Sequence, residues 1–248
     1  MLIKSTYKDL PVVAQFTPLG ASLTRWQIGE RDILFPLSQV VNHQSQHEIR
    51  GLSHPCLPWF GDKFGVRHGL LRNYVFPMPT TSADGFLVSF NSSKFRGSST
   101  FRWMFDGVVS ARVSGNKLSY SMFIRNPFEY PKNEDRGNMP VQFAWHPYLL
   151  CTDNSKLHIG SEVIPVSDWK PGESVEFTPT GDVAHMTLGG KETIELRMHP
   201  GFASSGGKVV IWSNNPQQYI CMEPVTHTVD LELGQSASVT FTLKFIPD

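Results

Sequence analysis

The 248-residue sequence predicts an all-β fold, a large antiparallel β-sandwich or barrel that forms one domain over residues 1–248. Twenty glycines and 18 prolines interrupt the chain so often that long helices have little room. Seventeen phenylalanines and many β-branched residues lie between these breaks, where they suit half-buried strands. Because all-β domains of this length often form one unit and no long polar run marks a boundary, a single domain is expected.

Apolar and polar residues alternate with a period of two in several segments, which is typical of strands with one buried face. These segments are 87–91, 108–113, 117–124, 193–198, 209–212 and 238–245. Turn sequences separate them, and Gly115-Asn116 and Gly189-Gly190 are typical of hairpin loops. No helix-length amphipathic segment and no repeat of fixed period is found.

The charge balance and the cysteines narrow the class of protein. Lys plus Arg and Asp plus Glu both number 22, so no net charge attracts nucleic acid or an anionic membrane. No apolar run approaches the roughly 18 residues of a membrane helix, and the N-terminal segment lacks a signal-peptide core. Cys56, Cys151 and Cys221 have no C-x-x-C spacing and cannot all pair. We therefore expect a cytoplasmic protein without nucleic-acid or membrane partners. A monomer or weak homodimer is also expected.

The segment 39–72 has no clean periodicity and contains four of the nine histidines. A long irregular stretch inside a β domain is usually functional or disordered, and its aromatic, Pro and Gly content favours an ordered functional loop. His43 and His47 have the spacing of metal ligands on a helix, with Glu48 and His54 nearby. Because no helix is evident, we interpret this group as a polar loop and predict no metal site.

Three clusters combine titratable side chains with aromatic residues. They are RG, PWFG and HGLLRN at 50–51, 58–61 and 68–73, FAWHPY at 143–148, and WSNNP and YICMEP at 212–216 and 219–224. A histidine beside aromatic residues is usually a structural residue, and a single arginine is usually a surface charge. Glu223 follows a segment that resembles a buried strand, where a carboxylate needs a partner, although it could also end that strand at the solvent edge.

In this order and at these separations, the six motifs resemble the aldose 1-epimerase superfamily, and most closely its hexose-6-phosphate 1-epimerase branch. Segments 16–36 and 231–245 also resemble the family's first and last strands, so the resemblance covers nearly the whole chain. It implies the galactose mutarotase-like supersandwich, a large antiparallel β-sandwich. It also implies a cofactor-independent mutarotase that interconverts the α and β anomers of an aldohexose or a hexose 6-phosphate.

The resemblance implies an acid–base pair. Ring opening requires one group to protonate the ring oxygen while another removes the proton of the anomeric hydroxyl, and each positioned transfer contributes about 10²–10⁴-fold. His146 matches the family's acid, Glu223 its base, and His68 a histidine that hydrogen-bonds the sugar. We expect Glu223 in a partly apolar pocket that raises its pKa. Candidates to line this pocket are Phe143, Trp145 and Trp212.

Arg50 and Arg72 match the phosphate-binding arginines of the branch, and Lys63 or Arg67 could extend this cluster. Arginine suits phosphate because its planar fork meets two oxygens and stays charged. The family also has a substrate-binding aspartate between the second and third clusters. Asp182 is the first candidate for this role.

Asp168 is the second candidate for the substrate-binding aspartate.

Two other functions compete with mutarotation. A non-catalytic carbohydrate-binding protein is possible on the same fold, but it would need no acid–base pair. A hydrolase or lyase is the other, although glycoside hydrolysis uses two flanking carboxylates and only one well-placed carboxylate is found.

Overall fold

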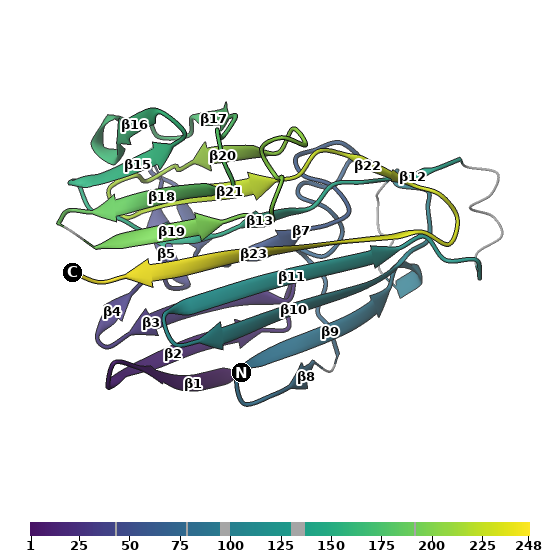
Figure 1. Ribbon diagram of the computed structural model, residues 1–248, viewed down its shortest axis with the longest axis horizontal. Coiled ribbons are helices and arrows are strands. Elements are labelled where there is room, and N and C mark those ends of the chain that lie inside the picture. The colour runs from purple at the N-terminus through teal and green to yellow at the C-terminus, as the bar shows by residue number, and fades with distance from the viewer. Residues whose placement is uncertain (43, 78, 95–99, 130–136, 191) are drawn as a thin grey trace.

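Two layers of antiparallel strands face each other in the structure, a computed structural model that describes the chain except residues 43, 78, 95–99, 130–136 and 191 (Figure 1). The large sheet has the strand order β16 (Glu162–Pro165), β15 (Ser155–Ile159), β18 (Val183–Leu188), β19 (Thr193–Arg197), β23 (Ser236–Ile246), β11 (Lys117–Arg125), β10 (Asp106–Ser114), β9 (Gly85–Asn91) and β8 (Thr80–Thr81). This sheet is one complete layer of the molecule.

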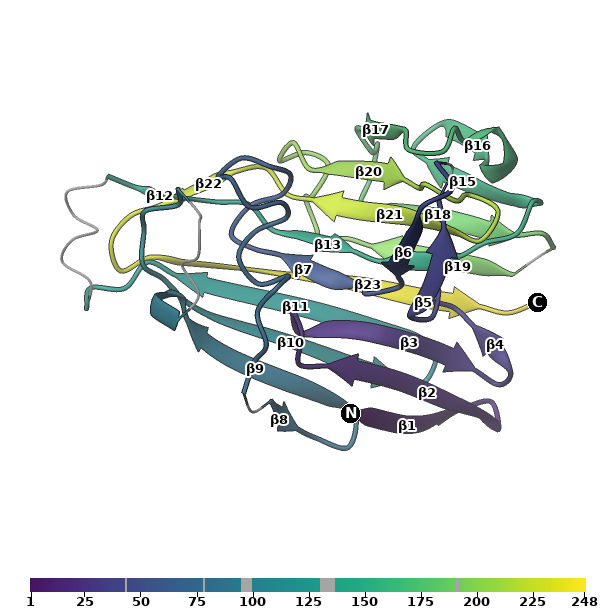
Figure 2. The same ribbon diagram turned by 180° about the vertical axis from the view of Figure 1, so that it is seen from behind.

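Two smaller sheets form the opposite layer (Figure 2). The first has the order β1 (Leu2–Tyr7), β2 (Leu10–Thr17), β3 (Ser22–Ile28) and β4 (Arg31–Asp32). The second has the order β17 (Ser174–Phe177), β20 (Lys208–Trp212), β21 (Tyr219–Val225), β13 (Ala144–His146) and β7 (His54–Cys56), and β14 (Tyr148–Leu150) also pairs with β21. Isolated bridges from Leu23 to Ser53 and from Leu34 to Leu149 join these sheets into one layer.

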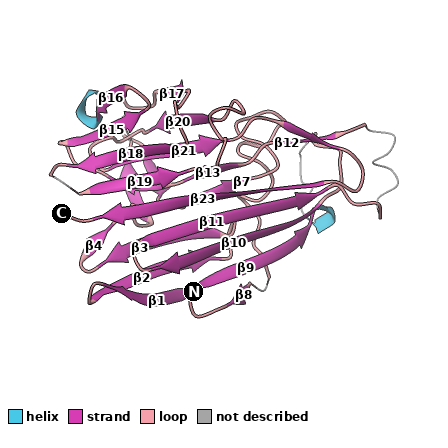
Figure 3. Cartoon of the chain, viewed as in Figure 1, coloured by secondary structure: helices cyan, strands magenta, loops and turns pink. Residues whose placement is uncertain are grey.

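Short elements complete the described regular structure, in which strands dominate (Figure 3). They are the hairpin β5 (Ser38–Val41) and β6 (His47–Arg50), the ribbon β12 (Met139–Val141) and β22 (Val229–Leu231), and the 3₁₀ turns η1 (Ser92–Lys94) and η3 (Val166–Asp168). The described part of the chain contains no helix long and apolar enough to cross a membrane. The predicted all-β antiparallel fold is confirmed.

The alternating segments of the sequence became strands, with small differences at the ends. β9, β10, β11, β19, β20 and β23 cover the six predicted segments. Gly115-Asn116 forms the predicted two-residue loop, since Ser114 pairs directly with Lys117. Most of these strands therefore follow from local alternation, because one face is buried and the other is not. The exception is β20, in which Val209, Val210 and Ile211 are all buried.

Aromatic side chains fill the space between the layers. The ring of Tyr120 on β11 stacks on Trp145 of β13, with 5.3 Å between centroids. Phe16 on β2 packs against the edge of Phe86 on β9 at 4.6 Å. These contacts each join the large sheet to the opposite layer, and aromatic pairs of this kind add about 0.5–1.5 kcal/mol beyond their area burial.

The irregular segment 39–72 covers the outer surface of the second layer. It forms the β5–β6 hairpin, then β7, and then the loop that leads to Tyr74. Figure 2 shows the hairpin on the side of the second layer that faces away from the large sheet. This placement brings the motifs RG, PWFG and HGLLRN over the strands that carry the FAWHPY and YICMEP motifs.

Candidate active site

Strand alternation turns His146 and Glu223 away from the main core. Trp145 packs into the core between the layers, so its neighbour His146 on β13 projects from the opposite face. On β21, Met222 is likewise in the core, and Glu223 projects outward beside His146. The prediction that Phe143 and Trp145 line the pocket is wrong, because both side chains lie in the main core.

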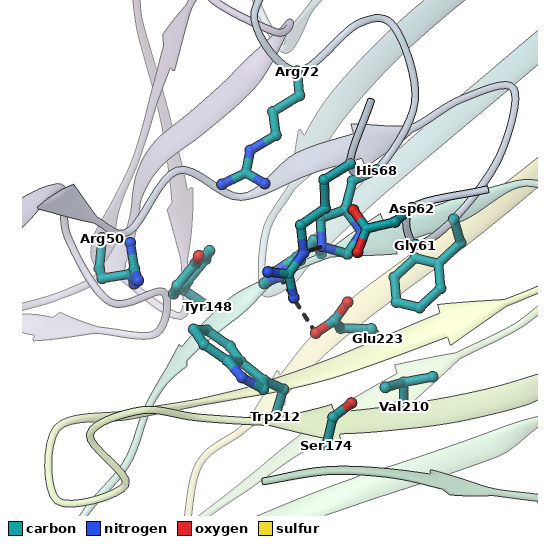
Figure 4. Close-up of a pocket in the computed structure, with 13 residues that line it drawn as sticks. Arg50, Gly61, Asp62, His68, Arg72, Tyr148, Ser174, Val210, Trp212 and Glu223 are labelled. Atoms are coloured by element: carbon teal, nitrogen blue, oxygen red, sulfur yellow. Dashed lines mark hydrogen bonds and ion pairs between the residues drawn. The ribbon is translucent and has the colours of Figure 1, made fainter. Parts of the chain in front are cut away.

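The outward side chains line a cavity of about 200 Å³ (Figure 4). Its lining residues come from the loop after β7 and from β6, β13, β14, β17, β20 and β21. They are Arg50, Phe60, Gly61, Asp62, Arg67, His68, Arg72, His146, Tyr148, Ser174, Val210, Trp212 and Glu223. The structure thus brings together His146, Glu223, His68, Arg50 and Arg72 in one cavity lining, with Arg67 and Trp212 beside them.

His146 and Glu223 form a buried pair. The Nε2 atom of His146 lies 3.4 Å from Oε1 of Glu223, and the two side chains are 6% and 2% exposed. Burial raises the pKa of Glu223 well above its ordinary value, against the opposing charges of Arg67 and Arg72. Burial also lowers the pKa of His146 well below its ordinary value. Both shifts favour a neutral pair, in which Glu223 carries the proton and His146 is uncharged.

Each member of the pair also has an unused polar atom. Nδ1 of His146 and Oε2 of Glu223 are buried and have no hydrogen-bond partner among the described residues. Buried polar groups are normally hydrogen-bonded, and an unsatisfied one costs about 1–3 kcal/mol. Orphaned groups of this kind at the bottom of a cavity are typical of a site that a polar ligand completes.

Two more histidines surround His146. The His54 ring stacks on the His146 ring with 4.9 Å between centroids, and the His68 ring meets it edge-on at 5.2 Å. Nδ1 of His54 lies 2.7 Å from the Leu52 carbonyl oxygen and donates to it. Burial lowers the pKa of His54 to about 3 and that of His68 to about 2. The cluster is therefore uncharged at neutral pH.

A constrained loop holds His68 in the cavity wall. His68 adopts a left-handed φ of 62°, and Gly69 follows with a φ of 83°. A Cβ atom on Gly69 would lie 2.3 Å from the Leu57 carbonyl oxygen, so glycine is required there. Leu57 and Gly69 pair in a parallel bridge that ties the two ends of this loop together.

Arg50 is held at the side of the cavity by its own partners. Its guanidinium pairs with Glu48 and lies over the Trp212 ring, 5.6 Å from the ring centre. Asn214 donates a hydrogen bond to the same Glu48 carboxylate. Burial by itself would lower the pKa of Arg50, but its polar surroundings, which include the Glu48 carboxylate, raise the pKa above its ordinary value.

Arg72 and Arg67 have no such acidic partner among the described residues. Arg67 donates from Nε to Nε2 of His68 at 3.2 Å, whereas Lys63 does not line the cavity. Arg50, Arg72 and Tyr148 also line a second space of about 140 Å³. Because Arg50, Arg72 and Tyr148 line both spaces, the second space is a small recess beside the main cavity, and two guanidinium groups border it.

The two candidate aspartates lie elsewhere. The Asp182 carboxylate accepts hydrogen bonds from the backbone amides of Gly201 and Ala203, at 2.9 and 3.3 Å. These bonds lower the pKa of Asp182 and hold the turn that follows β19. Asp168 is an exposed residue in η3. Neither lines the cavity, whose additional carboxylate is the exposed Asp62.

The histidine-rich group of segment 39–72 has three described members, His47, Glu48 and His54, which lie on the strands β6 and β7. His43 lies outside the described residues. His47 and Glu48 are consecutive residues of strand β6, and Glu48 is paired with Arg50. His54 belongs instead to the histidine cluster beside His146.

Sequence reasoning missed His54 and Tyr148 as components of the site. His54 is directly opposite His146 in the β7–β13 pairing, 92 residues away in sequence. No local spacing could indicate this pairing, because it depends on the register of two distant short strands. Tyr148 stacks on the other side of His146 at 4.9 Å, and its place in the FAWHPY motif was the available signal.

Comparison with solved structures places the fold as galactose mutarotase-like. The Slr1438 protein from Synechocystis sp. PCC 6803 has a TM-score of 0.71 and 17% identity over 100% of this chain and 96% of its own. A putative aldose 1-epimerase from Escherichia coli K12 has a TM-score of 0.69 and 11% identity over 99% of both chains. A galactose mutarotase-like protein from Lactobacillus casei has a TM-score of 0.69 and 12% identity, covering 99% and 100%.

The profile of the family described as aldose 1-epimerase matches residues 8–223 of this chain. This match spans most of the sequence, including every residue that lines the cavity. The protein belongs to the aldose 1-epimerase family. No curated protein matches the chain.

Proposed function

We propose that the protein is a cofactor-independent mutarotase that interconverts the α and β anomers of an aldohexose or hexose 6-phosphate. The observation that carries this proposal is the 3.4 Å contact between the buried His146 and Glu223 side chains in the cavity wall. Family membership supports the reaction class. Trp212 gives the cavity an aromatic surface of the kind that commonly lines small-molecule sites.

In the proposed reaction, Glu223 removes the proton of the anomeric hydroxyl and His146 donates a proton to the ring oxygen. The bond from the anomeric carbon to the ring oxygen breaks as the carbonyl bond forms. The aldehyde then rotates, and the ring recloses with both proton transfers reversed. No atom or proton is gained or lost over the cycle, so the pair returns to its starting state.

Burial of the pair matches this proton balance. The proposed ring opening starts from the less favoured ion-pair form, with the proton on His146, and ends with the neutral pair, with a proton on Glu223. A buried environment disfavours the ion pair, as the raised pKa of Glu223 and the lowered pKa of His146 show. Because ring opening converts the disfavoured ion pair into the neutral pair, burial favours the step that breaks the ring bond.

The arginines support a phosphorylated substrate. We propose that the phosphate occupies the recess between Arg50 and Arg72, while the sugar ring lies near His146, Glu223 and Trp212 in the main cavity. Arg72 forms no hydrogen bond or ion pair with the described residues, so its charge is free to receive an anion. Figure 4 shows Arg50 and Arg72 on the same side of the cavity.

Magnetisation-exchange NMR on the anomers of glucose, galactose and glucose 6-phosphate tests the activity directly. The wild-type protein should accelerate interconversion, and Glu223→Gln and His146→Asn should each lower kcat by about 100-fold or more. Sugar binding without accelerated exchange in the wild-type protein would refute the enzyme proposal in favour of a carbohydrate-binding protein.

Arg72→Ala tests the phosphate proposal separately. Loss of a charge-assisted contact of about 1.5–3 kcal/mol should lower kcat/KM for glucose 6-phosphate by about 10–100-fold and leave glucose nearly unchanged. Arg112→Ala is the matched control, because Arg112 is 73% exposed on β10 and pairs with Asp84. Equal losses for the phosphorylated and the free sugar would rule out an anion-binding role.

A further inference from the structure

Cys221 lies beside His146 and Glu223 but has no part in the proposed proton transfers. Donor atoms of the three residues, one nitrogen, one sulfur and one carboxylate oxygen, all lie within 4.8 Å of one another. All three side chains are buried. Among the described residues this is the one group of three or more such donors with spacing suited to a metal ion.

The backbone explains why the three donors converge. Cys221 and Glu223 are two residues apart on β21, so their side chains project from the same face of the strand. β13 pairs with the same strand and brings His146 to that face. The donors are thus mounted on two neighbouring strands rather than on mobile loops.

We propose that His146, Cys221 and Glu223 form a binding site for a thiophilic divalent cation such as Zn²⁺, and that the occupied site is catalytically inactive. Ligand atoms at about 2.0–2.3 Å from a tetrahedral zinc lie about 3.3–3.7 Å from one another. The nitrogen and the oxygen already have this separation at 3.4 Å. The sulfur requires a shift of at most about 1.5 Å to complete the same geometry.

The donor set selects the class of metal. A thiolate and an imidazole favour zinc, cobalt and cadmium over magnesium and calcium, which prefer oxygen ligands. His146 and Glu223 line the cavity, so the fourth coordination position opens toward it. Cys221 and Glu223 must release protons to bind, and the affinity should therefore increase with pH.

The expected consequence is inhibition, which rests on the proposed mutarotase function. A metal ion would occupy the Nε2 lone pair of His146 and the carboxylate of Glu223. Neither group could then exchange a proton with the sugar. The ion would also occupy part of the substrate cavity, so inhibition and sugar binding should compete.

A second pair of histidines provides an internal control. His158 and His185 are directly opposite on β15 and β18, and their rings stack at 4.4 Å. This pair lies apart from the cavity lining and lacks a third close donor among the residues that the structure describes. His185→Gln removes it without altering the proposed site.

Cobalt spectroscopy and zinc inhibition together test the proposal. Co²⁺ added to the wild-type protein should produce a thiolate-to-cobalt charge-transfer band, which Cys221→Ser and Cys221→Ala should abolish. Cys151→Ala and His185→Gln should retain it. Loss of a group that only supports a metal ligand typically weakens metal affinity by about 10–100-fold. Loss of the ligand Cys221 itself should therefore raise the inhibitory Zn²⁺ concentration by about 100-fold or more.

The two readouts separate the two proposals. If the protein shows no mutarotase activity, the cobalt band still tests the metal site. Absence of the band in the wild-type protein, or equal zinc inhibition of the wild type and both Cys221 variants, would overturn the proposed site. Cys221→Ser is included because its small side chain preserves packing if the alanine variant does not fold.

Discussion

The buried histidine cluster should make the protein sensitive to mild acid. In the unfolded chain His54 and His68 have an ordinary pKa of 6.5, whereas in the folded protein their pKa values are about 3 and about 2. The unfolded state therefore binds these protons first as the pH falls. The stability that the neutral histidines contribute is complete above pH 6.5 and is lost progressively as the pH falls toward the folded pKa values.

The magnitude follows from the pKa difference. Both folded pKa values lie below pH 5. Lowering the pH from 7 to 5 should therefore reduce the free energy of unfolding by about 2 kcal/mol for each histidine, or about 4 kcal/mol for the two. A domain typically has about 5–15 kcal/mol of stability in total. His146, whose pKa is also lowered, acts in the same direction, and Glu223, whose pKa is raised, acts in the opposite one.

Urea denaturation at pH 7, 6 and 5 measures this effect. His54→Phe preserves an aromatic ring against His146 but cannot bind a proton, so the stability lost between pH 7 and pH 5 should decrease by about 2 kcal/mol. His227→Gln, which replaces an exposed histidine outside the cluster, is the control variant. If the wild-type and His54→Phe proteins lose the same stability over this range, the reasoning is refuted.

Three further variants test the site and its support. Glu223→Gln should lower kcat by about 100-fold or more yet raise Tm at pH 7.5 by about 2–4 °C for a gain of about 1 kcal/mol. At that pH the unfolded glutamate is ionised and must be neutralised on burial, whereas glutamine is always neutral, so the gain should shrink toward pH 4 where the unfolded glutamate is mostly neutral. Gly69→Ala should lower stability by about 2 kcal/mol or more in urea denaturation, since its Cβ would clash with Leu57. Trp212→Ala should raise KM more than it lowers kcat, and the reverse would place Trp212 in the chemical step.

The site was predictable from sequence to the extent that its residues lie within local motifs. His146, Glu223, His68, Arg50 and Arg72 were selected from six ordered motifs, and the structure places all five in the lining of one cavity. Their chemical roles stay predictions until the variants are measured. Asp182 was selected from its residue type and its position between motifs, and its carboxylate instead holds the turn after β19.

The sequence by itself determined the strands with alternating residues, such as β10, β11 and β23, because period-two alternation is a local property that reflects one buried and one solvated face. It did not determine the facing of short strands buried on both sides. All three residues of β13 are buried, so alternation alone could not show that Trp145 points into the core and His146 into the cavity. Only the tertiary structure decided this, through the packing of the large sheet on one face.

The meeting of distant residues was also decided by the tertiary structure alone. His54, His146 and Glu223 come from three strands, and their contacts depend on the pairing of β7 with β13 and of β13 with β21. Such pairings are set by the burial of whole faces across the sheet rather than by any single segment. The sequence named His146 and Glu223 as the candidate acid and base, and the fold supplied the neutral histidine and the buried thiol beside them, because proximity in space arises from long-range strand register.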